Sequence, residues 1–149
     1  SVKVDNGRFY LAMPGKGNME ISLVAEGLRK IAMLAYLITN GSLKDKVALF
    51  WDEPETNLNS KLIKEVAKSL MALAQSEIQV FIATHSLFLL RELEILSVVS
   101  KGTIAQRYIV LSNNDEEIQV YQSDTVEEAE PIVSLDEALE QSDRYLGLE

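Results

Sequence analysis

Cysteine is absent from the 149 residues of this sequence, and histidine occurs only once. Without cysteine the chain can form no disulfide, use no thiolate as a nucleophile and build no cysteine-ligated zinc site. A single histidine also excludes a histidine-rich metal centre. These absences fit a protein of the reducing cytoplasm.

Long apolar runs are absent as well. No stretch approaches the roughly 18 consecutive apolar residues that a membrane-spanning helix needs, and residues 1–4 do not resemble a signal peptide. Hydrophobic residues nevertheless make up 47% of the sequence, which is enough to form the core of one domain or of part of one. We therefore expect a soluble, globular, cytoplasmic protein without a membrane partner.

Basic residues are scarce at the C-terminal end. Residues 115–149 carry 1 basic and 12 acidic side chains, a net charge of −11, whereas residues 1–114 have a net charge of +2. The acidic segment disfavours nucleic acid at that end of the chain. Its simplest interpretation is a solvated face.

One stretch organises the rest of the sequence. An apolar run over residues 47–51 ends abruptly in Asp52, Glu53 and Pro54. Such a run predicts a strand buried on both faces of a parallel sheet, and ligands of such sheets bind at the carboxyl ends of the strands. Two adjacent carboxylates there suit a bound cation or a proton transfer. The alternative is a simple strand-to-helix turn, which Pro54 and Asn59, a good helix N-cap, explain by themselves.

A second strand end carries polar groups too. Apolar residues recur at helical spacing over residues 62–73, which predicts an amphipathic helix, and residues 78–83 predict another buried strand that ends in Thr84-His85-Ser86. Strands joined through a crossover helix are normally parallel. We therefore expect Asp52 and His85, which are 33 residues apart, to emerge at the same edge of the sheet.

The remaining segments complete an α/β pattern, with a mostly parallel sheet, helices and small β-hairpins. Before the central strand, the sequence predicts a hairpin over residues 2–12 around Asn6-Gly7, a loop over 13–18, an extended segment over 20–24, and a buried helix over 28–38 that ends at Asn40-Gly41. After the second strand, it predicts a helix over 87–96, a hairpin of 104–111 and 118–121 turning at 113–115, a linker over 123–131, and a helix over 134–145 with Ser134 and Glu137 as a capping box.

The loop over residues 13–18 contains Gly15-Lys16-Gly17, which superficially suggests a phosphate-binding loop. The spacing G-x-x-x-x-G-K-[ST] fails, because Tyr10 stands at the first glycine position and Gly17 at that of the serine or threonine. We interpret the segment as a turn. The helix preceded by Gly27 offers a second, weak anion site through its free N–H groups and its dipole.

Asp52, Glu53 and His85 form the set that phosphoryl transfer from a nucleotide to water requires. An aspartate at a strand end holds Mg²⁺, the next glutamate orients or deprotonates the attacking water, and a histidine on the adjacent strand reaches the γ-phosphate. The set therefore predicts Asp52 as the metal ligand, with Glu53 and His85 as catalytic residues.

In this order the segments resemble those of the ABC-type ATPases, in the soluble AAA, RecF, SMC and OLD-like group rather than the transporters. The resemblance covers roughly residues 20–90. LFWDEP at residues 49–54 resembles a Walker B motif with its catalytic glutamate, and ETNLN at 55–59 resembles the D-loop. ATHS at 83–86 resembles the H-loop, and VAEGL at 24–28 resembles the signature motif.

The resemblance implies a layered P-loop NTPase-like fold that uses ATP and Mg²⁺ and acts as a homodimer with ATP sandwiched between two copies. It assigns five residues to the nucleotide contacts: Ala25, Glu26, Gly27, Asn57 and Asn59. Relatives act in DNA repair, phage defence and chromosome handling, so DNA or an effector nuclease is a candidate partner.

Two departures from the family pattern stand out. Ala25 occupies the position where the signature motif usually has a serine, so one hydroxyl contact with the partner's γ-phosphate is missing. No Walker A loop and no Q-loop occur in the 149 residues, and the family places both upstream of the signature motif. We therefore expect residues 1–149 to be the C-terminal half of an ATP-binding domain whose missing N-terminal half carries Walker A.

Two other interpretations remain open. In the first interpretation, the chain is a catalytically inactive fragment, or a dimerisation or interaction domain, without a phosphate loop. In the second it is a metal-dependent nuclease that uses Asp52, Glu53 and Glu55, although these lie on one turn with no distant third carboxylate evident. A G-x-x-x-x-G-K-[ST] motif upstream of Ser1 would favour the ATPase over the first alternative.

Overall fold

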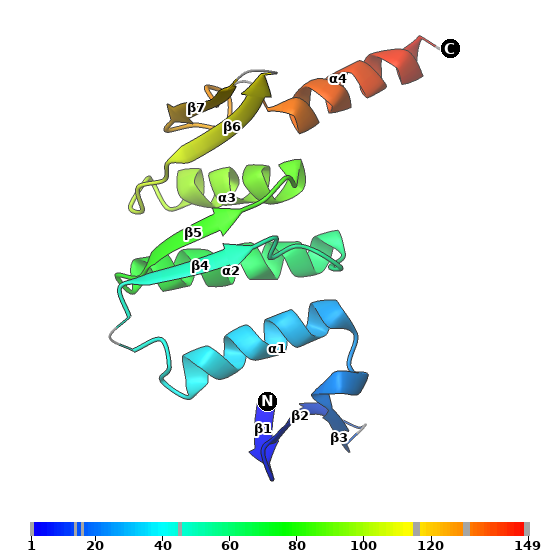
Figure 1. Cartoon of the computed structure of the whole chain (residues 1–149), viewed down its shortest axis with the longest axis vertical. Coiled ribbons are helices and arrows are strands. Elements are labelled where there is room, and N and C mark those ends of the chain that lie inside the picture. The colour runs from blue at the N-terminus through cyan, green and yellow to red at the C-terminus, as the bar shows by residue number, and fades with distance from the viewer. Residues whose placement is uncertain are drawn as a thin grey trace. The chain divides into compact units, whose positions relative to one another are not determined.

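The computed structural model describes residues 2–13, 15, 17–44, 46–114, 117–129 and 132–147. The chain divides into two compact units, Ser1–Ala83 and Thr84–Glu149. Figure 1 shows the succession of helices and strands along the chain by colour. In the described part of the chain, no helix is long and apolar enough to cross a membrane.

The first unit opens with a three-stranded antiparallel sheet in the order β1-β2-β3. Its strands are β1 (Val2–Asp5), β2 (Arg8–Met13) and β3 (Gly17–Glu20). Asn6 and Gly7 join β1 to β2 with φ angles of 47° and 73°, as a two-residue hairpin turn requires. The hairpin predicted from Asn-Gly is confirmed.

Two details of this region differ from the sequence predictions. The loop predicted over residues 13–18 is shorter, because β3 begins inside it; Pro14 and Lys16 lie outside the described residues. The extended segment predicted over residues 20–24 is instead a 3₁₀ turn, η1 (Ile21–Leu23). Pairing with β2 ends at Glu20, after which the Val24 N–H donates to the Ile21 carbonyl at 3.2 Å and turns the chain.

The centre of the first unit is a parallel strand pair with two helices. These elements are α1 (Glu26–Thr39), β4 (Ala48–Asp52), α2 (Ser60–Gln75) and β5 (Gln79–Ala83). Strands β4 and β5 pair in parallel, in register from Ala48 opposite Gln79 to Asp52 opposite Ala83. The two strands therefore end at the same level, and the predicted parallel arrangement is confirmed.

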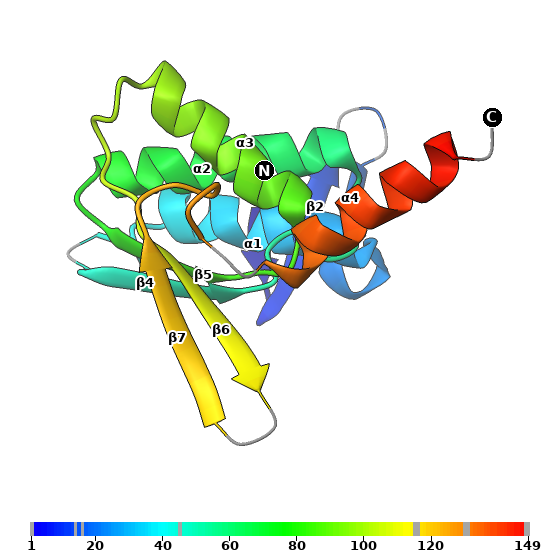
Figure 2. The same ribbon diagram turned by 90° about the horizontal axis from the view of Figure 1, so that it is seen from above.

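Helices α1 and α2 cover one face of this strand pair (Figure 2). The core between them contains three buried residues, Leu34, Leu73 and Ile78, packed against Leu43, Leu49, Trp51 and Val80. On the other face, the rings of Phe50 and Phe81 stack at 4.5 Å, and Phe50 is 74% exposed. The prediction that both strands are buried on both faces is wrong here, because the described residues of this unit cover only one face.

Helix α1 begins two residues before the predicted start at residue 28, so Gly27 lies inside its first turn. Its N-cap is Ala25, which makes no side-chain capping bond. The predicted C-terminus at Asn40 and Gly41 is confirmed, with Gly41 at a φ of 76°. Burial of α1 on all sides is not observed, because three of its apolar side chains are at least 40% exposed: Leu28, Met33 and Ile38.

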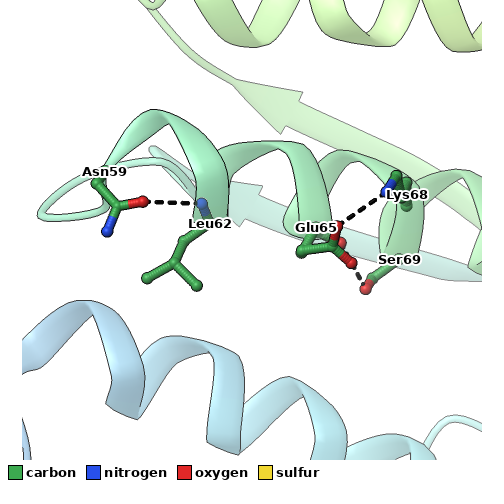
Figure 3. A network of polar contacts seen from close by, with 5 residues as sticks. All are labelled: Asn59, Leu62, Glu65, Lys68 and Ser69. Carbon is green, nitrogen blue, oxygen red and sulfur yellow. Dashed lines mark hydrogen bonds and ion pairs between the residues drawn. The ribbon is translucent and has the colours of Figure 1, made fainter.

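Helix α2 has the predicted amphipathic pattern and the predicted cap. The Asn59 side chain accepts a hydrogen bond from the Leu62 N–H at 3.1 Å (Figure 3). On the solvent side, the Lys68 ammonium and the Ser69 hydroxyl bond to the carboxylate and the carbonyl of Glu65, each at 2.8 Å. Six residues form the buried side: Ile63, Val66, Ala67, Leu70, Met71 and Leu73.

The second unit contains α3 (Leu87–Val99), the antiparallel hairpin of β6 (Tyr108–Asn114) and β7 (Glu117–Ser123), and α4 (Val133–Leu146). The predicted hairpin is confirmed, although β6 begins at Tyr108 rather than at residue 104. Its turn residue Asp115 and the end of the predicted linker, residues 130 and 131, lie outside the described residues.

The predicted capping box of the last helix is wrong. Helix α4 begins at Val133, with Ile132 as its N-cap and no side-chain capping bond, so Ser134 lies inside the helix. The reason is that α4 starts before the first residue able to cap it.

Helix α3 fastens the segments on either side of the hairpin. Glu94 accepts a hydrogen bond from the Val126 N–H at 3.1 Å, and Gln106 donates to the Leu93 carbonyl at 3.3 Å. Tyr108 in turn donates to Gln106 at 2.8 Å. Burial, together with the nearby charge of Glu94, raises the pKa of Tyr108 to about 12. These contacts connect α3 to the segment that enters the hairpin and to the segment that leaves it.

The first turn of α1 lies directly against the loop of residues 53–59 that joins β4 to α2. A Cβ atom added to Gly27 would lie 2.4 Å from the Asn57 carbonyl oxygen and 2.5 Å from Cδ2 of Leu58. Real Cβ atoms do not approach other atoms so closely. Glycine is therefore required for this helix to meet this loop.

We expect Gly27→Ala to lower the free energy of unfolding by about 1–3 kcal/mol, because a backbone oxygen must move to admit the methyl group. Helix propensity alone predicts the opposite, since alanine is the better helix former by up to about 1 kcal/mol. Urea unfolding of the chain measures the difference. Gly147→Ala is the control, because its Cβ would meet nothing nearer than 3.4 Å. A Gly27→Ala chain as stable as the wild type would contradict the close approach.

We expect Asn59→Ala to destabilise the chain by about 0.5–2 kcal/mol, because an N–H group in the first turn of α2 loses its acceptor. Asn59→Asp retains a capping oxygen and should stay close to the wild type. The same urea experiment compares the three proteins. An equal loss in both variants would mean that capping is not the contribution of Asn59.

Candidate functional site

Asp52 closes strand β4 and carries an exposed side chain. Side chains alternate along a strand, so Asp52 shares a face with Phe50, whereas Leu49 and Trp51 point to the core. The carboxylate therefore stands at the carboxyl end of a parallel strand, on the face that α1 and α2 leave uncovered. This is the position from which such sheets bind ligands.

Glu53 follows Asp52 in a left-handed backbone conformation, with a φ of 44°. Its N–H donates to the Ala83 carbonyl at 2.8 Å, which continues the pairing with β5. Its carbonyl accepts hydrogen bonds from the Lys30 ammonium at 2.8 Å and from the Thr56 N–H at 3.2 Å. The left-handed region costs a non-glycine residue about 1–2 kcal/mol, so these bonds offset a real strain.

The loop after Glu53 is a tight, buried turn. Pro54 is fully buried and Glu55 is 7% exposed. The bond from Thr56 N–H to the Glu53 carbonyl closes a turn with proline at its second position, which suits the fixed φ of proline. The Thr56 hydroxyl also donates to Oε2 of Glu53 at 2.9 Å and fixes the direction of that carboxylate. The predicted strand-to-helix turn is thus present, and it also orients the acidic group.

The structure brings together two predicted nucleotide-contact residues that are 31 positions apart. The Asn57 side chain donates to Oε2 of Glu26 at 2.8 Å, and Asn57 has a φ of 63°. Gly27 packs against the same loop, and Ala25 is exposed at the N-cap of α1. The predicted contacts of these residues with phosphate stay predictions, whereas their contacts with one another are structural facts.

His85 belongs to the second unit and follows Ala83 by two residues. Its neighbours form the turn into α3, in which the Ser86 N–H donates to the Thr84 hydroxyl at 3.0 Å and the Ser86 hydroxyl caps the helix. The register of β4 and β5 confirms that Asp52 and Ala83 share an edge. The approach of His85 to a phosphate stays a prediction.

Two residues without a predicted role, Lys30 and Thr56, both bond to Glu53. Lys30 had a detectable signal, because it lies three residues after Gly27 and four after Glu26. Residues at these spacings share one face of a helix. A charged residue on the helix face that carries the glycine indicates a polar contact at that face.

Asp52 stands where a carboxylate could hold a magnesium ion. Mg²⁺ is usually bound through one or two carboxylates together with waters and substrate phosphates, so a single exposed carboxylate at a strand end suits it. Among the described residues, no group of three or more histidine, aspartate or glutamate side chains is placed to hold a metal ion.

Solved structures with a similar fold come from studies of SMC proteins. One, from a study of the ATP-driven dimerization and DNA-stimulated activation of SMC ATPases, has a TM-score of 0.63 and 18% identity, over 91% of this chain and 79% of that chain. Another, the SmcHead bound to the C-winged helix domain of ScpA, has a TM-score of 0.62 and 17% identity, over 80% and 32% of the two chains. These similarities confirm the α/β fold of P-loop NTPases.

A sequence relative is the Old nuclease of Escherichia phage P2, which is 32% identical over 103 residues. The match covers 60% of this chain and 18% of that protein, so the chain spans a small part of that relative. The family model described as "AAA domain, putative AbiEii toxin, Type IV TA system" matches residues 2–91. Since that match covers more than half of the chain, the chain belongs to this AAA domain family, within the AAA, SMC and OLD-like ATPases that its motifs predicted.

Proposed function

We propose that the chain is the C-terminal half of an ABC-type ATPase head that hydrolyses ATP between two copies of the complete domain. The observation that carries this proposal is the conformation of Glu53. A glutamate beside the strand-end Asp52 is held in a strained backbone geometry, with its carboxylate oriented by Thr56. Strain of this kind gathers at functional sites, where the surrounding structure maintains it.

In this proposal each carboxylate has its own task. Asp52 would hold Mg²⁺, which when bound with ATP neutralises charge on the phosphates. Glu53 would take a proton from the attacking water. The Thr56 bond supports this role, because a general base must keep its oxygen within hydrogen-bond reach of the proton it removes.

The start of α1 would meet the phosphates bound to the partner copy. Ala25 supplies no side-chain cap, so the amides of the first turn depend on another acceptor, and a phosphate is the anion that a helix N-terminus favours. Gly27, Glu26, Asn57 and Asn59 would contribute around it, and His85 would stabilise charge on the γ-phosphate. The work on ATP-driven dimerization of SMC ATPases supports a sandwiched homodimer.

The missing part in this proposal is the phosphate loop, supplied by an N-terminal half outside residues 1–149. The likeness to the Old nuclease and to a family whose description names a putative toxin supports a role in DNA repair, phage defence or chromosome handling, with DNA or an effector nuclease as partner. The cytoplasm is the location that we propose for it.

We expect Glu53→Gln to reduce ATP turnover about 10²- to 10⁴-fold in the complete ATPase, because the base is lost while Asp52 remains. Binding of Mg-ATP should persist and the nucleotide-bound dimer should live longer. Steady-state turnover, nucleotide binding and dimer lifetime are measured together. Glu65→Gln is the matched control, since Glu65 lies on the solvent side of α2. Wild-type turnover in Glu53→Gln would remove Glu53 from the mechanism.

We expect the 149-residue chain alone to show no rise in melting temperature with millimolar Mg-ATP. The phosphate loop supplies most of the N–H groups and the lysine that hold the β- and γ-phosphates. Ligand at about 100 times its dissociation constant stabilises a protein by roughly 2.7 kcal/mol, which a thermal melt detects easily. A rise that Asp52→Ala abolishes would show that residues 1–149 contain their own phosphate-binding loop.

A further inference from the structure

Lys30 makes a long-range hydrogen bond within the first unit. It projects from α1, and its ammonium donates at 2.8 Å to the main-chain carbonyl of Glu53, 23 residues away. The bond is partly buried. Because a charged donor makes a stronger hydrogen bond than a neutral one, this contact has the strength to fix the position of the carbonyl.

We propose that Lys30 is a positioning residue that couples the first turn of α1 to the base Glu53. This inference rests on the proposed ATPase function, and adds to it a route by which α1 controls hydrolysis within its own chain. No motif assigned above includes Lys30. Its ammonium contacts the backbone of Glu53, so it acts on the carboxylate through the conformation of that residue.

The backbone of Glu53 is fixed at two points. Its N–H is tied to Ala83 of β5, and its carbonyl receives both Lys30 and Thr56. The bond from Thr56 lies within the turn and moves with it. Lys30 reaches this carbonyl from another element, α1, so its bond ties the turn to that helix.

Three neighbouring contacts make α1 and the loop move together. Lys30 shares its helix face with Gly27 and Glu26. Gly27 allows the helix backbone to reach Asn57, and Glu26 accepts a hydrogen bond from the Asn57 side chain. A shift of the first turn of α1 must therefore either move the loop or break these contacts.

This linkage would connect the dimer interface, where α1 begins, to the backbone of Glu53. In the proposed function, the N-terminus of α1 contacts phosphate that is bound to the partner copy. Such a contact stabilises one position of α1. Because Lys30 is bonded to the carbonyl of Glu53, that position of α1 also fixes the position of the carbonyl. The base then adopts its working orientation when the partner's nucleotide is in place, which is a population shift between two positions of one rigid group.

The test compares Lys30→Met, Lys30→Arg and Glu53→Gln in the complete ATPase. We expect Lys30→Met to lower kcat about 10- to 100-fold, as the loss of one charge-assisted hydrogen bond implies. Its KM for Mg-ATP should stay within about twofold, because ground-state binding is untouched. Lys30→Arg should recover most of the activity, since a guanidinium also donates to a carbonyl. Lys61→Met, on exposed Lys61 of α2, is the matched control and should behave as wild type.

The outcomes separate this inference from the proposed function. Wild-type kcat in Lys30→Met, with Glu53→Gln inactive, overturns the positioning role and leaves the ATPase intact. A second pattern also overturns the positioning role: the melting temperature falls in Lys30→Met, and Lys30→Arg does not restore the activity. That pattern belongs to a purely structural residue. Full turnover in Glu53→Gln overturns the proposed base instead.

A measurement on the 149-residue chain needs no activity. The three-bond coupling between the amide and α protons of Glu53, together with its carbon chemical shifts, reports the backbone φ by NMR. We expect these values to indicate the left-handed region in the wild type and in Lys30→Arg, and to change in Lys30→Met. Identical values in the wild type and Lys30→Met overturn the inference, even if the chain turns out to belong to no ATPase.

Discussion

The missing side chain of Gly27 sets how closely α1 can approach the loop of residues 53–59, and the polar contacts of the site depend on that approach. The bonds from Lys30 to the Glu53 carbonyl and from Asn57 to Glu26 are both 2.8 Å long. A helix moved outward by the width of a methyl group would stretch both beyond hydrogen-bonding range. Gly27 therefore determines whether α1 can form hydrogen bonds with the loop of residues 53–59.

The loop contains two non-glycine residues with positive φ, and they have different meanings. Asn57 tolerates the left-handed region, because asparagine is enriched there. Glu53 has no such compensation of its own and depends on Ala83, Lys30 and Thr56. The strain at Glu53 is thus sustained from three directions, which is the reason to interpret this residue as functional rather than as an ordinary turn residue.

Local patterns in the sequence predicted much of this fold. The Asn6-Gly7 hairpin, the amphipathic α2 with its Asn59 cap, and the parallel register that brings Asp52 level with Ala83 all follow from periodicity, turn chemistry or chain connectivity. Some errors concern local elements, such as the 3₁₀ turn found where an extended segment was predicted over residues 20–24. Others concern what surrounds an element. The apolar sequence of a strand shows that both of its faces can be buried. Which faces are covered depends on the elements packed against the strand, and Phe50 is 74% exposed.

The contacts of the candidate site were the least predictable part. Motif spacing identified Asp52, Glu53 and the start of α1 as separate segments. The bonds between them join residues 23 and 31 positions apart, and no local pattern specifies such pairings. The signal for Lys30 was its spacing from Gly27 and Glu26, which indicates a shared helix face but not the partner on the loop.

Asp52 and Glu53 are adjacent in sequence, yet different parts of the fold hold them. Asp52 is the last residue of β4, and its side chain extends from the face that carries Phe50, so the strand alone determines its place. Glu53 is the first residue beyond the strand, and its carbonyl is tied to α1, which packs on the opposite face. A movement of α1 can therefore turn Glu53 while Asp52 stays fixed on the strand. In the proposed function, the protein would thus adjust the base separately from the metal ligand, although both stand at one strand end.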